Sequence, residues 1–194
     1  RFVILNIVLL ASFTTFLKGQ DLDSLLNIIT AENNRNFVYG TFKGTTIVNS
    51  QTTEVPGHND LHFLVSHRFG AVNTGLYNFF GLDQGTTRLG LEYGIKDVLG
   101  LSIGRSTYEK TVDGGFKVKI LRQQTGARVI PVTVSLYSAF FVKTTKWEHP
   151  ERENLFSSRI SYSTQLLIAR KFSKNLSLQI NPSYVHFNLV PTAE

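Results

Sequence analysis

The sequence contains no cysteine, and this absence excludes a disulfide framework and a thiolate metal site. The chain is not a lipoprotein either, because lipidation needs a cysteine directly after the signal peptide. The excess of positive charge is also modest. The formal net charge is +6, and Lys and Arg are spread along the 194 residues rather than clustered, which argues against nucleic-acid binding. This length is enough for one domain.

Residues 1–17 have the basic start and apolar centre of a secretory signal peptide. We predict that residues 1–19 are removed on export, which lowers the formal net charge from +6 to +4 because two of the removed residues are basic. A helical anchor is the alternative. A membrane helix needs about 20 apolar residues, and polar Ser12, Thr14 and Thr15 interrupt this run.

After the signal peptide, no stretch is long and apolar enough for a membrane helix. Apolar residues recur at helical spacing between Leu22 and Ile29, so we expect residues 20–35 to form a short periplasmic helix and linker. From Phe37 on, the periodicity becomes that of strands. The expected strands lie near 38–52, 59–69, 85–95, 98–107, 115–123, 130–143, 157–171 and 175–189.

The clearest strand pair runs from Arg88 to Gly104 around a turn at Lys96-Asp97. Its first strand places leucine, tyrosine and isoleucine on one face and glycine or charged residues on the other, because strand side chains alternate. Tight turns alternate with longer loops such as 70–84 and 144–154, and aromatic residues lie near strand ends. A compact loop is expected at Thr111–Gly115. These features are typical of outer-membrane barrels, apolar outside and polar within.

The sequence therefore predicts an all-β, antiparallel transmembrane β-barrel over residues 36–194, with about eight strands present. The last residues lack the aromatic end of a closing strand, so we expect the domain to continue beyond Glu194. The expected role is passage of a small solute, or a structural or accessory role in the outer membrane. A soluble periplasmic barrel that carries a lipophilic ligand is one alternative.

Charged residues opposite the apolar positions should face the lumen. Counting from Leu61, Leu89 and Phe116 and their alternating apolar neighbours, these residues are Arg68, Arg88, Glu92, Lys117 and Lys119. Four cations against one acid predict a preference for anions if the barrel conducts, since low-dielectric walls focus the field. We expect Glu92 to pair with an arginine. The alternative is a salt-bridged, plugged interior without conduction.

Other groups of polar residues give weaker support for a catalytic or metal-binding site. Ser66 and His67 suggest a lipid-modifying enzyme, the second alternative, but adjacent strand residues point to opposite faces and cannot meet. The loop residues read as solvated charge rather than as Ca²⁺ ligands, because no loop shows the dense acidic spacing of a calcium motif; they are Asp83, Glu109, Asp113, Glu148, His149 and Glu153. We expect no catalytic residues, no metal and no cofactor. The expected partners are outer-membrane lipid and a small anionic solute, and the sequence names no protein partner.

Several runs resemble a family of predicted barrels. They are Thr41–Thr45, Ser66–Gly70, Phe80–Gln84, Gly104–Thr111 and Gln165–Phe172, in matching order and spacing. The family is domain of unknown function 5777, found mainly in Bacteroidota, and the likeness extends from Asn36 to Glu194. It implies a barrel in the outer membrane with further strands beyond Glu194. It implies no activity, ligand or catalytic residue.

Overall fold

The structure is a computed structural model, and residue 26 and residues 35–48, 50–147 and 149–189 are described. The predicted signal peptide, residues 1–19, lies outside the described residues. Of the predicted helix and linker over residues 20–35, only helical Leu26 and Arg35, the first residue of β1, are described. No helix among the described residues is long and apolar enough to cross a membrane.

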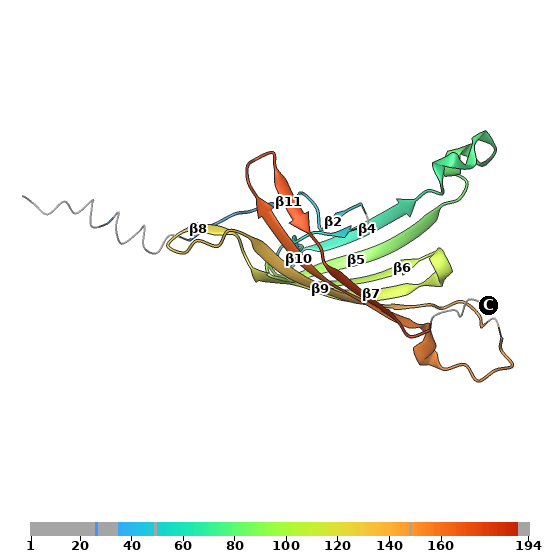
Figure 1. Cartoon of the computed structure of the whole chain (residues 1–194). Coiled ribbons are helices and arrows are strands. Elements are labelled where there is room, and N and C mark those ends of the chain that lie inside the picture. Colours follow the sequence, from blue (N-terminus) through green and yellow to red (C-terminus); the bar gives the residue numbers. More distant parts are fainter. Residues whose placement is uncertain (1–25, 27–34, 49, 148, 190–194) are drawn as a thin grey trace, which may run out of the picture.

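The main sheet is an antiparallel meander curled into a half-barrel (Figure 1). Its strands are β4 (Leu61–Arg68), β5 (Thr86–Lys96), β6 (Leu99–Ser106), β7 (Val112–Leu121), β9 (Thr133–Val142), β10 (Ile160–Lys171), β11 (Ser177–Ile180) and β12 (Ser183–Phe187). Each expected strand from residue 59 to residue 171 is confirmed within a few residues.

The connections differ at the two ends of the sheet. Short turns follow β5 and β10, and the segment that carries β8 (Gln124–Gly126) follows β7, at what we call the short-turn end. Longer loops follow β4 and β9 at the loop end (Figure 1). These loops contain short 3₁₀ turns, η1 (Val72–Thr74), η2 (Leu76–Gly81) and η4 (Phe156–Arg159).

The expected strand 175–189 appears as β11 and β12, which both pair with β10 in one continuous register. The break falls at Pro182. Leu166 N donates to Pro182 O at 3.0 Å, but proline has no N–H to return the second bond of that pair. The two pieces therefore act as a single strand that lacks one backbone hydrogen bond to β10.

The two faces of the sheet have opposite character. On β5, the convex-face side chains Leu89, Leu91 and Tyr93 are 39–48% exposed, whereas Glu92 on the concave face is 7% exposed. A soluble sheet buries its apolar face. Here the apolar face is the exposed one, and such a surface is stable only when something other than water covers it.

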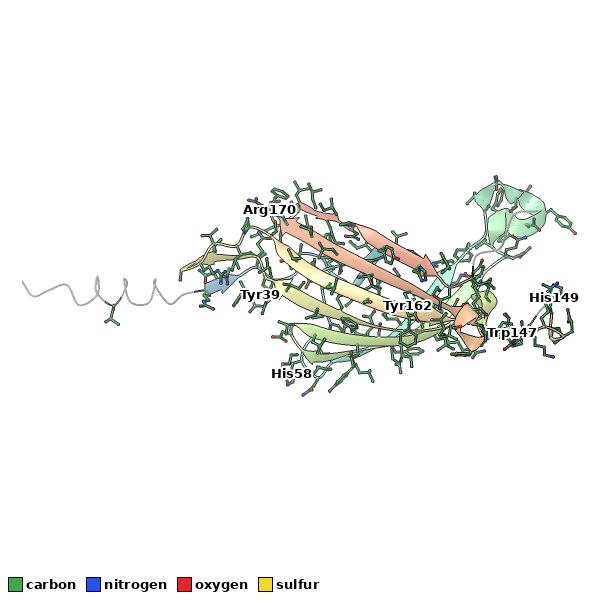
Figure 2. The ribbon with its side chains drawn as sticks, turned by 60° about the horizontal axis from the view of Figure 1, so that its bottom comes forward. Tyr39, His58, Trp147, His149, Tyr162 and Arg170 are labelled. Atoms are coloured by element: carbon green, nitrogen blue, oxygen red, sulfur yellow. The ribbon has the colours of Figure 1, made fainter. Side chains whose placement is uncertain are left out.

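Aromatic rings with arginine partners mark both ends of the half-barrel. At the short-turn end, Arg170 lies 4.8 Å from the ring centre of Phe172, near Tyr39 in the view of Figure 2. At the loop end, Arg159 lies 3.6 Å from the ring centre of Trp147 (Figure 2). Rings of this kind favour the boundary between lipid and water, which suggests where the apolar band of the wall ends.

The expected wall strand at 38–52 is wrong. Among its described residues this region holds only the two-residue strands β2 (Thr46–Ile47) and β3 (Ser50–Gln51), which pair with each other. It lies within the curl of the sheet (Figure 1). Ahead of it, β1 (Arg35–Phe37) pairs with β8 at the short-turn end. The threonines and glycines of this stretch supply little apolar surface for a lipid-facing row, so burial against a polar interior is the stable alternative.

The expected loop at Thr111–Gly115 is also placed wrongly. The turn lies earlier, at η3 (Tyr108–Lys110), and β7 already begins at Val112. Asp113 is therefore a wall residue paired with Gly104 of β6, and it is 4% exposed on the concave face. Two consecutive glycines after Asp113 suggested a turn, but in the structure they continue the strand.

Candidate site on the concave face

One stretch of the chain fills the concave face, and we call it the inner segment (residues 41–48 and 50–57). It contacts Lys117 of β7, Ser135 of β9 and Gln179 of β11 through hydrogen bonds. It also lies against Gly94 of β5 and Gly100 of β6. Only the hollow of a curled sheet brings these five strands around one segment. The inner segment therefore blocks this part of the interior.

Glu54 is bonded through both its carboxylate and its backbone oxygen. Its Oε2 lies 3.2 Å from Lys119 Nζ, and its Oε1 accepts a hydrogen bond from Thr41 N at 3.0 Å. Lys117 Nζ donates to the backbone oxygens of Glu54 and Thr45, both at 2.9 Å. Two inward lysines of β7, two residues apart, thus hold Glu54 by its backbone oxygen and by its carboxylate.

The other anchors of the inner segment are also polar. Ser135 Oγ donates to Thr53 O at 3.2 Å, and Thr53 N donates to Gln179 Oε1 at 3.1 Å. Gln179 Nε2 returns a bond to Gln51 O at 2.8 Å. Thr52 and Thr53 are fully buried. The inner segment is therefore held to β9 and β11 by polar bonds, although the described residues also contain a small buried apolar cluster of Tyr137, Ala139 and Leu167.

Two pairs of facing glycines shape the concave face. Gly94 faces Gly100 across β5 and β6, and a Cβ on Gly94 would lie 2.5 Å from Pro56 O and 2.9 Å from Pro56 C. Real Cβ atoms essentially never come that close to backbone. The inner segment can pass over β5 at this point only because residue 94 has no side chain.

The second glycine pair makes room for an arginine. Gly90 faces Gly104, and a Cβ on Gly104 would lie 2.6 Å from Arg88 Cζ. The guanidinium of Arg88 crosses β6 over this gap and binds Asp113, with Nε 2.9 Å from Oδ1 and a second bond from Nη2 to Oδ2. This is a two-pronged ion pair of the strong kind.

The structure places the predicted lumen residues as follows. Lys117, Lys119, Arg88 and Glu92 lie on the concave face, and Arg68 is an exposed residue at the end of β4. Arg88 binds Asp113, so it is not the partner of Glu92. Glu92 Oε2 is buried and has no hydrogen-bond partner among the described residues.

Sequence reasoning missed two acids of this site. The glycines after Asp113 predict a loop there, and Glu54 follows the expected strand at 38–52, which the structure does not contain. With both included, the concave face holds three cations (Arg88, Lys117 and Lys119) and three acids (Glu54, Glu92 and Asp113), so the predicted excess of positive charge is not found there. The facing glycines were the available signal, because glycine inside a strand often marks a close approach of other groups.

The remaining candidates stay apart from this site. Ser66 and His67 are neighbours on β4, and their side chains leave opposite faces of the strand. Glu109 pairs with Lys143 at 2.9 Å, and His149 with Glu151 at 3.0 Å. Within the described residues, no three His, Asp or Glu side chains gather as a metal site would require.

An antiparallel sheet that curls around a polar interior and exposes an apolar convex face is the architecture of a membrane-bound β-barrel. The chain belongs to the family described as membrane bound beta barrel domain (DUF5777), whose family model matches residues 42–194. The predicted family and fold class are confirmed. The matched region contains the sheet and all of the inner segment except Thr41. Comparison with curated proteins gave no match, and comparison with solved structures gave none either.

Proposed function

We propose that this protein is an outer-membrane barrel that passes a small solute, and that the inner segment closes it until the segment moves. The short-turn end faces the periplasm in this proposal and the loop end faces outward, as in barrels with short periplasmic turns. The predicted export signal supports this location. The expected partners are outer-membrane lipid on the convex face and a small anionic solute within.

The observation that carries the proposal is the polar attachment of the inner segment. Its anchors are hydrogen bonds and one ion pair, from Lys117, Lys119, Ser135, Gln179 and Asn181. The neutral bonds contribute about 0.5–1.5 kcal/mol each and those from the two ammonium groups about 1.5–3 kcal/mol, because water can replace a lost partner. A segment held by bonds that water can replace can leave the interior more readily than one packed by large apolar side chains.

A permanent filler with a structural role in the envelope is the second candidate. The full burial of Thr52 and Thr53 favours it, since buried segments exchange slowly. We propose no catalytic activity, because Ser66 and His67 do not meet. A Ser66→Ala variant should therefore leave the lipid composition of the outer membrane unchanged, and altered lipid would revive the enzyme alternative.

An engineered disulfide that ties the inner segment to β6 can distinguish a segment that moves from one that fills the barrel permanently. An ideal Cβ on Gly100 lies 3.5 Å from Val55 Cβ, at the short end of the range that disulfides span. The sequence has no other cysteine, so the pair Val55→Cys and Gly100→Cys is free of competing thiols. In planar bilayers, the full-length variant should conduct after reduction and close after oxidation.

The single variant Val55→Cys is the matched control, because it should conduct equally in both redox states. If the double variant conducts equally when oxidised and reduced, the inner segment does not gate the barrel. Absence of conductance from the reduced variant and from the wild-type protein would favour the structural role.

A further inference from the structure

The side chain of Glu54 occupies a position that a small free anion would suit. Its carboxylate lies between Lys119 Nζ, 3.2 Å from Oε2, and the backbone N–H of Thr41, 3.0 Å from Oε1. The Lys119 side chain is 12% exposed and that of Glu54 is 19% exposed. This carboxylate therefore sits in a partly dry, positively charged surrounding.

The two lysines depend on the inner segment for their hydrogen bonds. The bonds found for Lys117 Nζ go to Thr45 O and Glu54 O, and the one found for Lys119 Nζ goes to the Glu54 carboxylate. When the segment leaves, these partners leave with it. Glu92 lines the same small cavity as Lys117, but one acid cannot balance two ammonium groups.

A buried ammonium group without a hydrogen-bond partner raises the free energy of the protein. The open state therefore needs either a replacement anion or water molecules around both lysines. A replacement that matches the geometry left by Glu54 has two oxygens on one carbon. The cavity beside Lys117 and Glu92 measures only about 10 Å³, room for about one water molecule. In the closed state this cavity therefore has no room for an added anion beside Lys117, and Lys119 can accept one only in place of the Glu54 carboxylate that it binds.

We propose that Lys119 binds a small carboxylate solute, aided by Lys117, which loses its backbone partners when the segment leaves, and that the Glu54 carboxylate fills the place beside Lys119 in the closed state as an internal substitute. The solute then competes with the inner segment and stabilises the open state. This inference rests on the proposed function and names the solute class for the same site. Its tests use acetate as the probe.

The first test is binding of acetate to detergent-solubilised full-length protein by titration calorimetry. Glu54→Ala leaves a carboxylate-sized space beside Lys119, so it should bind acetate at least about tenfold more tightly than the wild type, whose own carboxylate competes at high effective concentration. Glu54→Gln fills the same space without charge and should not bind. Adding Lys119→Gln to Glu54→Ala should abolish binding.

The matched control is Glu109→Ala, which removes an acid from the exposed pair with Lys143 at the loop end. It should leave acetate binding at the wild-type level. Equal acetate affinity in Glu54→Ala and the wild type would overturn the proposal. So would binding that survives loss of Lys119.

The second test asks whether acetate opens the segment that carries Glu54. Thr53 is fully buried and its hydroxyl has no hydrogen-bond partner among the described residues, so Thr53→Cys reports opening by its rate of thiol labelling. Acetate should raise that rate by the factor 1 + [acetate]/Kd, about twofold at a concentration equal to Kd. Chloride at the same ionic strength should not.

The outcomes separate this inference from the proposed function. Labelling that occurs but responds equally to acetate and chloride shows a mobile segment without a carboxylate site, which overturns only the inference. A preference for phosphate over acetate would overturn the carboxylate class. Absence of labelling under all conditions would overturn the moving segment and with it the competition.

Discussion

Gly94→Ala gives the sharpest test of the packing between the inner segment and the sheet. The added methyl group would lie 2.5 Å from Pro56 O and 2.9 Å from Pro56 C, and closer still to Gly57 O. These are backbone atoms, and ordinary contact begins near 3.4 Å. Either the segment moves by about an ångström or the sheet does, at the cost of about 1–3 kcal/mol that overpacking brings.

The sheet resists this movement more than the segment does. Gly94 exchanges backbone hydrogen bonds with the residues that lead into β4, since Gly94 N donates to Asp60 O at 3.0 Å and Asn59 N donates to Gly94 O at 2.8 Å. We therefore expect the inner segment to shift. The free energy of unfolding should fall by about 1–3 kcal/mol, and thiol labelling of Thr53→Cys should become faster.

Gly100→Ala is the matched control. It faces Gly94 across the sheet, but its Cβ would lie 3.3 Å from Pro56 Cδ and 3.5 Å from Val55 Cβ, which are side-chain atoms at nearly ordinary distances. On backbone grounds alone, alanine in a strand is better than glycine by about 0.5–1 kcal/mol. Urea unfolding in lipid vesicles compares the two variants. Equal stability would refute the predicted clash at residue 94.

The remaining predictions concern the wall and the export signal. Asp113→Ala should lower the free energy of unfolding by about 3 kcal/mol because Arg88 loses its buried partner, whereas loss of exposed Glu109 should cost less than about 1 kcal/mol; an equal loss on urea unfolding would contradict this. Residues 35–189 expressed alone should aggregate in detergent, because the outer edges of β4 and of β11 with β12 are unpaired within the described residues; a monodisperse species on size-exclusion chromatography would show otherwise. N-terminal sequencing of protein recovered from outer membranes should begin near Gln20, and a start at residue 1 would disprove cleavage.

The strands from residue 59 to residue 171 could be predicted because their information is local. The alternation of apolar and polar residues around Leu89 and Glu92 assigns each side chain to a face of the sheet. Adjacent antiparallel strands also follow each other in the sequence, because only a short connection is needed between them. The inward placement of Lys117 and Lys119 follows from the same parity. Errors arose where local signals conflicted, as at Asp113, where two following glycines suggested a turn.

The sequence by itself determined a membrane barrel wall, since the period of apolar residues sets which face meets lipid. Only the tertiary structure decided what lies inside. The partners of Lys117 and Lys119 come from the inner segment, more than sixty residues earlier in the chain. Neither periodicity nor spacing encodes such a contact. It depends on how the curled sheet closes around a segment. It also depends on Gly94 and Gly100, because their missing side chains matter only where Pro56 lies against them.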